Sequence, residues 1–359
     1  MATPRRAMPR QRDEDIQPGC FDMFCGVLRA CGLLCYVACP PIPSYITNKL
    51  AFHPPQKGLT YRIELKNESE RKIKNISEVN EGDQTQLVVR NVANGTDFIY
   101  LEAEVELFVA ETKYKNHLVC VKCKLIEPPL NPTLQDQVIL FCQPNSSDLG
   151  GFLQPSMMNF VNYANHFQVD LFAFDYSGYG YSSGTQCEKN VYADVRAVYQ
   201  KIREMHPTKG IVLMGYSIGT TAVIDLAASN PEGLVGVILV APFTSGLRLV
   251  SAKPTEPKTC WADSFTSYDK IGNIETRVLI CHGDIDEVIP LSHGLALYDK
   301  LKNPVPPSVI HGANHQTILS GRHYQTFDRI ANFLRNETMV SSSRSREMFS
   351  NRSTMRDFE

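Results

Sequence analysis

From about residue 137 onward the sequence alternates between short apolar runs and amphipathic segments, and this alternation constrains the fold most. The apolar runs have the length of buried strands. The segments between them place apolar residues on one helical face, as Val191, Val195, Val198 and Ile202 do. Alternating strands and helices predict an α/β fold whose mainly parallel sheet is doubly wound. The expected strands are 137–142, 168–175, 210–217, 234–242, 277–283 and 307–312, and the expected helices are 190–206, 220–230, 292–301 and 323–336.

Two earlier segments, 97–111 and 117–127, alternate apolar and polar residues, which is typical of half-buried antiparallel strands. We therefore expect antiparallel strands at the N-terminal side of the sheet. The expected organisation is a disordered N-terminus with a cysteine-rich leader (1–43), a connecting segment (44–96), the α/β domain (97–336) and a disordered Ser/Arg-rich tail (337–359).

The motif G-x-S-x-G occurs as Gly215–Gly219, between the apolar run "IVLM" and the helical pattern "TTAVIDLAA". In the α/β-hydrolase fold this motif places a nucleophilic serine on a sharp strand-to-helix turn, where a Cβ on either glycine would collide with neighbouring backbone. The motif alone is common by chance, but the strand and helix around it are the context that it requires. Ser217 is therefore the candidate nucleophile.

A serine hydroxyl needs a base to take its proton and an acid to orient that base, in the chain order Ser, acid, His. His315 lies in the loop after the last predicted strand, where its imidazole could reach Ser217. The other histidines after the serine are His293 and His323, in predicted helices, and His282 and His311, at strand ends, where packing or turn roles are expected.

The acid is expected in "HGDIDEVIP", the loop after the preceding strand. Asp286 fits the spacing H-G-x-x-D, and Asp284 is the fallback. The sequence thus predicts a triad of Ser217, Asp286 and His315.

The chain contains six longer stretches of distinctive sequence: "CPPIPSYITNKLAFHPP", "FDYSGYGYSSG", "NVYADVRA", "SIGTTAVIDLA", "APFTSGLRL" and "HGDIDEVIPLSHGLALYDK". Together they resemble the α/β-hydrolase-domain-containing protein 17 family, over about residues 36 to 335. The resemblance implies a serine hydrolase, anchored to the cytoplasmic face of plasma and endosomal membranes, that removes palmitate from cysteines of membrane proteins. It implies the same triad, with no cofactor and no metal.

The chain departs from this family near the expected oxyanion hole. The family's His-Gly-Asn loop is Gln143-Pro144-Asn145 here. By the resemblance, Asn145 and Ile218 supply the two backbone N–H donors, but the fixed φ of Pro144 makes a different loop path possible. The nucleophile turn carries Tyr216 where the family usually has Gln, and the segment around the histidine, "GANHQT", also differs.

Five of the chain's eleven cysteines lie between residues 20 and 39. Scattered cysteines elsewhere indicate a reducing compartment, so disulfides are not expected. The spacing lacks the C-x-x-C pair of a zinc site, and the apolar run is too short for a membrane-spanning helix. S-acylation remains, and several sites would give stable anchoring. The candidate lipidation sites are Cys20, Cys25, Cys31, Cys35 and Cys39.

Other features favour less specific interpretations. The net charge of −2 argues against a nucleic-acid binder, and we expect a monomer. Cys120 and Cys123 form a lone C-x-x-C on a strand, interpreted as packing. Trp261 is a candidate for the rim of an acyl groove, although packing is slightly favoured. N-x-[ST] triplets occur at Asn67, Asn75, Asn94, Asn145, Asn336 and Asn351, without a signal-peptide pattern before them.

Three functions stay open at the level of sequence. The first is a palmitoyl-protein thioesterase whose substrates are S-palmitoylated membrane proteins. The second is a serine esterase or lipase for small lipid esters. The third is a non-catalytic, membrane-anchored protein that retains the hydrolase fold, which the altered oxyanion loop favours.

Overall fold

The computed structural model describes residues 48–49, 51–66, 73–79, 83–156 and 158–340. The chain divides at Ala51, and the unit Ala51–Glu359 holds the fold. The five leader cysteines and most of the expected Ser/Arg-rich tail lie outside the described residues. The proposed domain boundaries therefore stay predictions. No helix in the described ranges is long and apolar enough to span a membrane.

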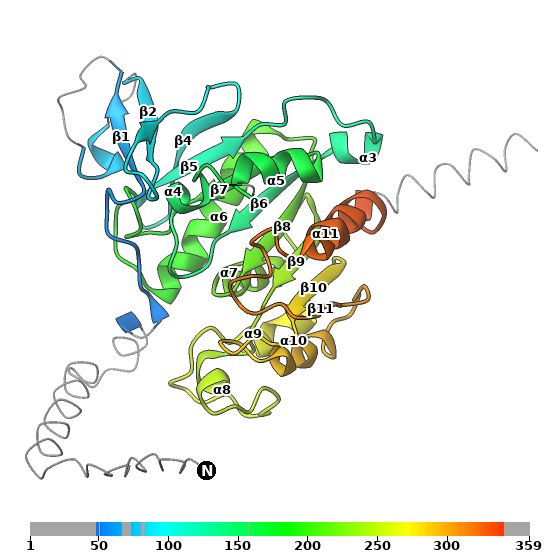
Figure 1. Ribbon diagram of the computed structural model, residues 1–359. Helices are drawn as coiled ribbons and strands as arrows, with labels where there is room; N and C mark the ends of the chain where they lie inside the picture. Colours follow the sequence, from blue (N-terminus) through cyan, green and yellow to red (C-terminus); the bar gives the residue numbers. More distant parts are fainter. Residues whose placement is uncertain (1–47, 50, 67–72, 80–82, 157, 341–359) are drawn as a thin grey trace, which may run out of the picture. The chain divides into compact units, whose positions relative to one another are not determined.

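A sheet of eight strands forms the centre of this unit, in the order β11-β10-β9-β8-β6-β7-β5-β4 (Figure 1). Neighbours from β7 to β11 run parallel, whereas β5 is antiparallel to both β4 and β7. The predicted α/β-hydrolase fold, with antiparallel N-terminal strands, is confirmed. The strands are β4 Val105–Glu111, β5 His117–Cys123, β6 Gln137–Cys142, β7 Asp170–Phe174, β8 Gly210–Tyr216, β9 Leu234–Val240, β10 Val278–Gly283 and β11 Ser308–Ile310.

Helices cover both faces of the sheet, and each face has its own hydrophobic core (Figure 1). One core includes residues of α5 and α11, and the other includes residues of α6, α7 and α10. Cys123 belongs to the first core and Cys120 to the second, so this pair lies on opposite faces. The helices are α3 Pro132–Gln135, α4 Leu149–Phe152, α5 Phe160–Phe167, α6 Glu188–Met205, α7 Gly219–Ala227, α8 Gly246–Val250, α9 Ser267–Lys270, α10 Leu291–Tyr298 and α11 Tyr324–Asn336, with 3₁₀ turns η1 Ile76–Glu78 and η2 Ile271–Asn273.

The expected connecting segment, 44–96, contains ordered structure that the sequence analysis missed. Strands β1 (Tyr61–Leu65) and β2 (Thr85–Arg90) pair antiparallel and form a second sheet with β3 (Asp97–Phe98). Alternate residues of β1 are buried, which is the period-2 pattern of a strand with one covered face. The charged stretch after β1 concealed this short signal. The expected strand 97–111 is likewise divided, into β3 and β4.

Candidate active site

Ser217 lies on a tight turn between β8 and α7. Its φ is +55°, a left-handed conformation that costs a non-glycine residue about 1–2 kcal/mol. A Cβ on Gly219 would lie 2.1 Å from the carbonyl oxygen of Cys142, and one on Gly215 would lie 2.7 Å from the carbonyl oxygen of Gly219. The two glycines thus allow β6, β8 and α7 to approach closely enough to hold the strained serine.

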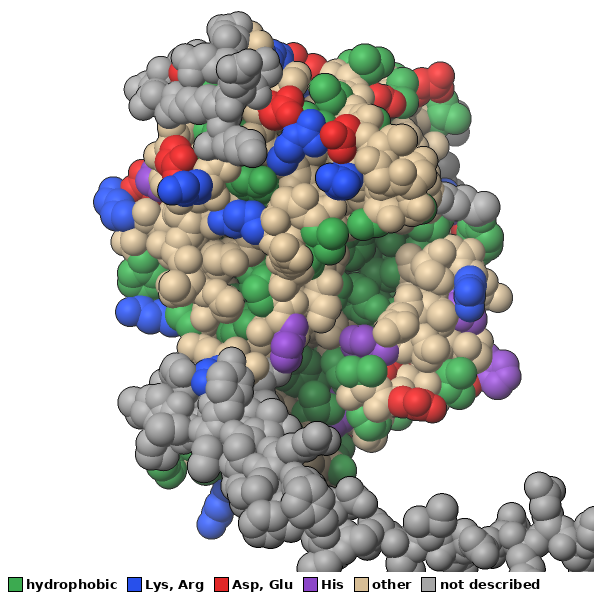
Figure 2. All heavy atoms as spheres, turned by 60° about the vertical axis from the view of Figure 1, so that its left-hand side comes forward, with side chains coloured by type: hydrophobic (Ala, Val, Ile, Leu, Met, Phe, Trp, Pro, Cys, Tyr) green, Lys and Arg blue, Asp and Glu red, His purple; other side chains and the backbone are tan. Residues whose placement is uncertain are grey.

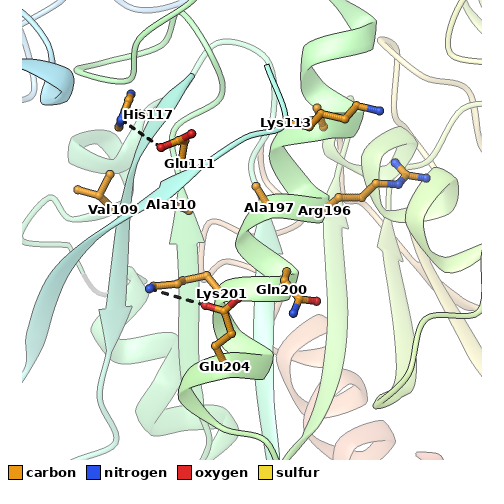
Figure 3. Close-up of a pocket in the computed structure, with 11 residues that line it drawn as sticks. Val109, Ala110, Glu111, Lys113, His117, Arg196, Ala197, Gln200, Lys201 and Glu204 are labelled. Atoms are coloured by element: carbon orange, nitrogen blue, oxygen red, sulfur yellow. Dashed lines mark ion pairs between the residues drawn. The ribbon is translucent and has the colours of Figure 1, made fainter. Parts of the chain in front are cut away.

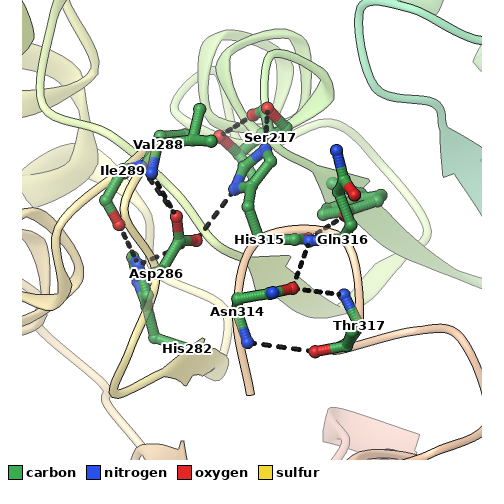
Figure 4. A network of polar contacts seen from close by, with 11 residues as sticks. Ser217, His282, Asp286, Val288, Ile289, Asn314, His315, Gln316 and Thr317 are labelled. Atoms are coloured by element: carbon green, nitrogen blue, oxygen red, sulfur yellow. Dashed lines mark hydrogen bonds and ion pairs between the residues drawn. The ribbon is translucent and has the colours of Figure 1, made fainter. Parts of the chain in front are cut away.

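Loops after β10 and β11 bring the predicted acid and base to this turn (Figure 4). His315 Nε2 lies 3.0 Å from Ser217 Oγ, and His315 Nδ1 lies 2.8 Å from Asp286 Oδ2. The three side chains therefore form a continuous hydrogen-bonded chain, although Ser217 and His315 are 98 residues apart in sequence. In a catalytic triad the base likewise contacts the serine with one ring nitrogen and the orienting acid with the other.

The carboxylate of Asp286 is buried and fully engaged. Its Oδ1 accepts hydrogen bonds from the backbone N–H groups of Val288 (2.9 Å) and Ile289 (2.8 Å). Burial alone would raise the pKa of Asp286, but the hydrogen bonds from His315 and Ile289 and the charge of the imidazole outweigh burial and hold this pKa below its ordinary value. Asp286 is thus kept ionised, as an acid that orients a histidine must be.

His282 also lies in this network, which the sequence analysis did not anticipate. Its Nε2 is 2.8 Å from the carbonyl oxygen of Ile289 and 3.7 Å from Asp286 Oδ2 (Figure 4). Burial lowers the pKa of His282. A Cβ on Gly294 would lie 2.6 Å from His282 Nδ1, so the glycine of "SHGLALY" makes room for the ring. Gly294 was thus the sequence signal from which the position of the His282 ring could have been inferred.

The alternative candidates lie elsewhere. The fallback acid Asp284 bonds the exposed His311, at 2.6 Å, rather than His315. His293 is buried in α10, with Nδ1 2.9 Å from Thr244 Oγ1, and burial lowers its pKa to about 4. His323 precedes α11.

Two departures from the family pattern meet at the base. The Tyr216 hydroxyl donates a hydrogen bond to the carbonyl oxygen of His315, and the two rings lie 5.5 Å apart. Asn314 Oδ1 accepts from the N–H groups of Gln316 (3.1 Å) and Thr317 (2.9 Å), which closes the loop locally. The altered residues therefore hold the histidine loop through contacts of their own.

The expected oxyanion loop follows β6. Neither Asn145 nor Ile218 has a backbone N–H that donates to an acceptor within the described part of the chain. The side chain of Gln143 is buried, and its Nε2 donates to Asp175 Oδ1 at 2.7 Å. The backbone carbonyl oxygen of Gln143 accepts from the Tyr176 hydroxyl at 2.8 Å. Gln143 thus fixes the start of the loop through Asp175 and Tyr176. The backbone N–H groups of Asn145 and Ile218 are left to bind an oxyanion.

Asp175, at the end of β7, is a fully buried carboxylate beneath this loop. It accepts hydrogen bonds from Gln143, from the Leu149 N–H (2.9 Å) and from the Tyr61 hydroxyl. Burial, and then the charge of neighbouring Asp148, raises the pKa of Asp175 to about 7. Asp175 therefore connects β1 to the oxyanion loop. No sequence motif indicated this connection.

The expectation that Trp261 packs is wrong, because its side chain is 87% exposed. It lies in the excursion between β9 and α9, together with exposed Leu247 and Val250. The buried guanidinium of Arg248 holds this excursion by donating hydrogen bonds to the Glu256 carbonyl oxygen (2.9 Å), the Thr259 hydroxyl (2.8 Å) and the Asp269 carboxylate (3.2 Å). The segment is therefore ordered by polar contacts and leaves apolar side chains at the surface.

A cavity with a volume of about 590 Å³ lies away from this site. It is lined by residues of edge strand β4 and helix α6 (Figure 3). On the face shown in Figure 2, hydrophobic side chains line a hollow, with histidine side chains at its edge. Among the described residues no cluster of His, Cys, Asp and Glu has metal-binding geometry. The cavity of Figure 3 is lined by Val109, Ala110, Glu111, Lys113, His117, Ala193, Arg196, Ala197, Gln200, Lys201 and Glu204.

Comparison with known proteins agrees with this description. Residues 156–268 match the family model described as serine aminopeptidase, S33. An esterase from Pyrococcus furiosus shares the fold at a TM-score of 0.52 and 15% identity, covering 67% of this chain and 95% of the esterase. The fold and the matched families define the protein as a serine hydrolase of the α/β-hydrolase class.

Its nearer relatives belong to one family. The human alpha/beta hydrolase domain-containing protein 17B is 35% identical over 314 residues, covering 85% of this chain and 96% of the relative. Protein 17C of Xenopus laevis is 36% identical, covering 85% and 94%. The chain belongs to the alpha/beta hydrolase domain-containing protein 17 family.

Proposed function

We propose that the protein hydrolyses the thioester of S-palmitoylated cysteines on membrane proteins, using Ser217 as nucleophile, His315 as base and Asp286 as the acid that orients His315. The observation that carries the acyl-transfer chemistry is the pair of hydrogen bonds that His315 makes, at 3.0 Å to Ser217 and 2.8 Å to Asp286. The resemblance of the sequence to membrane-anchored thioesterases supports the choice of a palmitoyl thioester.

The proposed reaction has two halves. His315 Nε2 takes the proton of Ser217 Oγ as that oxygen attacks the thioester carbonyl carbon, and the resulting oxyanion accepts hydrogen bonds from the N–H groups of Ile218 and Asn145. The C–S bond then breaks, and His315 returns the proton to the leaving cysteine thiolate. Water, activated by His315, hydrolyses the acyl-serine and releases the fatty acid.

The attachment of the leader supports action at a membrane surface. Phe52, thirteen residues after Cys39, is buried with its ring 5.8 Å from that of Phe265, which follows the exposed excursion carrying Trp261. The chain therefore enters the hydrolase unit beside this excursion. Acylation of the leader cysteines would anchor the chain on the N-terminal side of this entry point. We propose that the protein acts as a monomer at the cytoplasmic face of plasma and endosomal membranes.

A fluorophosphonate probe tests the catalytic proposal, because it labels only an activated serine. We expect wild type to be labelled and Ser217→Ala to be unlabelled. Asp286→Asn should lower kcat by about 10⁴-fold through loss of histidine orientation, whereas Asp284→Asn, at the fallback acid, should change it little. An unlabelled wild type would support the non-catalytic alternative.

Substrate class is decided by a second assay. An S-palmitoyl-cysteine peptide and a glycerolipid ester are offered to the full chain under the same conditions. Faster turnover of the peptide supports the thioesterase, and preference for the glycerolipid would make the protein an esterase or lipase instead.

A further inference from the structure

The segment that joins the leader to the domain touches the expected oxyanion loop. The backbone N–H of His53 donates to Asn145 Oδ1 at 2.8 Å, and the ring Nδ1 of His53 lies 3.1 Å from Asn145 Nδ2. The backbone and the ring of His53 thus contact both polar atoms of the Asn145 carboxamide. They join residues that are 92 positions apart in sequence.

Aromatic residues hold this contact from the other side. The Tyr179 hydroxyl donates to Asn145 Oδ1 at 2.8 Å, so that oxygen accepts two hydrogen bonds. Phe52, next to His53, is buried, and its ring lies 6.5 Å from the ring of Tyr179 and 5.8 Å from that of Phe265, both in edge-to-face arrangements. Phe52 therefore fixes the backbone from which His53 reaches Asn145.

The loop needs such support because of Pro144. Proline fixes φ but contributes no N–H, so the residue before Asn145 cannot hold the loop through a backbone donor. Gln143 holds one end of the loop on Asp175. The contacts of His53 and Tyr179 hold the Asn145 side chain, and with it the direction of the Asn145 backbone N–H.

We propose that His53 is a positioning residue for the oxyanion hole, acting through Asn145. The inference rests on the proposed function, because an oxyanion donor matters only in acyl transfer. It adds that a residue of the segment between the leader and the hydrolase unit helps to complete the active site. An extended chain from Cys39 to His53 spans at most about 50 Å, so an anchored leader would keep the oxyanion loop within that distance of its attachment.

Kinetics of the full chain with p-nitrophenyl butyrate as a probe ester test this role. His53→Pro removes the backbone donor and the ring acceptor, and should lower kcat about 10-fold, which is less than the 10²–10³ expected for deleting an oxyanion donor, with little change in KM. His53→Asn keeps the donor and offers Oδ1 near the position of Nδ1, so it should restore most of the rate relative to His53→Ala. His117→Ala, which alters a histidine on β5 near the cavity of Figure 3, is the matched control.

A double-mutant cycle separates positioning from general damage. Asn145→Ala keeps the backbone N–H of residue 145 but removes the carboxamide that His53 and Tyr179 contact. If His53 acts through that carboxamide, adding His53→Pro to Asn145→Ala should slow the enzyme no further. Full additivity of the two changes in activation free energy would overturn the proposal.

Hydrogen–deuterium exchange gives a readout that does not depend on activity. The backbone amides of residue 143 and of residues 145–148 should exchange faster in His53→Pro than in wild type or His117→Ala. Unchanged exchange would overturn the inference even in an active hydrolase. A wild type that fails to react with the ester or with fluorophosphonate would overturn the proposed function, and the exchange measurement would still decide the role of His53.

Discussion

At the scale of single residues, the nucleophile turn combines backbone strain with two very close approaches. Ser217 adopts φ +55°, and Gly219 packs against the end of β6 at a distance that excludes any side chain. The hydrogen bond from the Ser217 N–H to the Val240 carbonyl oxygen, at 2.9 Å, ties the strained residue to β9. The strain is thus held by neighbouring strands rather than by the turn itself.

Gly219→Ala tests the close approach. Its Cβ would lie 2.1 Å from the Cys142 carbonyl oxygen, so backbone must move, and we expect a loss of roughly 1–3 kcal/mol or more in the free energy of unfolding. Gly312→Ala is the control, because its Cβ would meet no atom within 4 Å and only the positive φ costs about 1 kcal/mol. Urea unfolding measures both, and equal losses would contradict the packing argument.

At the scale of elements, a buried carboxyl group at the end of β7 is hydrogen-bonded to the oxyanion loop. Asp175 connects this loop to β1 through Gln143, Leu149 and Tyr61. Its pKa is raised from 3.8 to about 7, so the folded protein binds this proton more tightly than the unfolded chain does. The contribution of Asp175 to stability is therefore greatest below about pH 4 and is lost as the pH rises to about 7.

Asp175→Asn removes this pH dependence while keeping a similar shape. We expect the stability of wild type, relative to the variant, to decrease between about pH 5 and about pH 8. Urea unfolding at the two pH values measures the change. Asp170→Asn, at a half-buried carboxylate where β7 begins, is the control. Parallel behaviour of wild type and Asp175→Asn would show that Asp175 does not carry the raised pKa.

At the scale of the whole molecule, the leader and the hydrolase unit are predicted to act together. The candidate lipidation sites Cys20 to Cys39 precede a unit in which His53, close to its start, contacts Asn145 of the expected oxyanion loop. The leader would thus carry the same kind of thioester that the domain is proposed to cleave. If the domain cleaves its own anchor, the Ser217→Ala variant should retain more acyl groups on the leader than wild type does.

Replacing all five leader cysteines with serine should release the protein from membranes, because stable anchoring needs at least two lipid signals. Cell fractionation measures the result, and Cys260→Ser, at an exposed cysteine of the hydrolase unit, is the control. Unchanged membrane retention of the five-site variant would refute acylation of the leader as the anchor.

The sequence by itself determined the fold class and the candidate triad. Both depend on local patterns: strand and helix periodicity, the spacing of G-x-S-x-G, and the order of serine, acid and histidine along the chain. Only the tertiary structure decided which distant residues meet, such as His282 with Asp286, Tyr216 with the His315 carbonyl, and His53 with Asn145. Periodicity reports that a side chain is buried, but its partner depends on how the strands and loops pack.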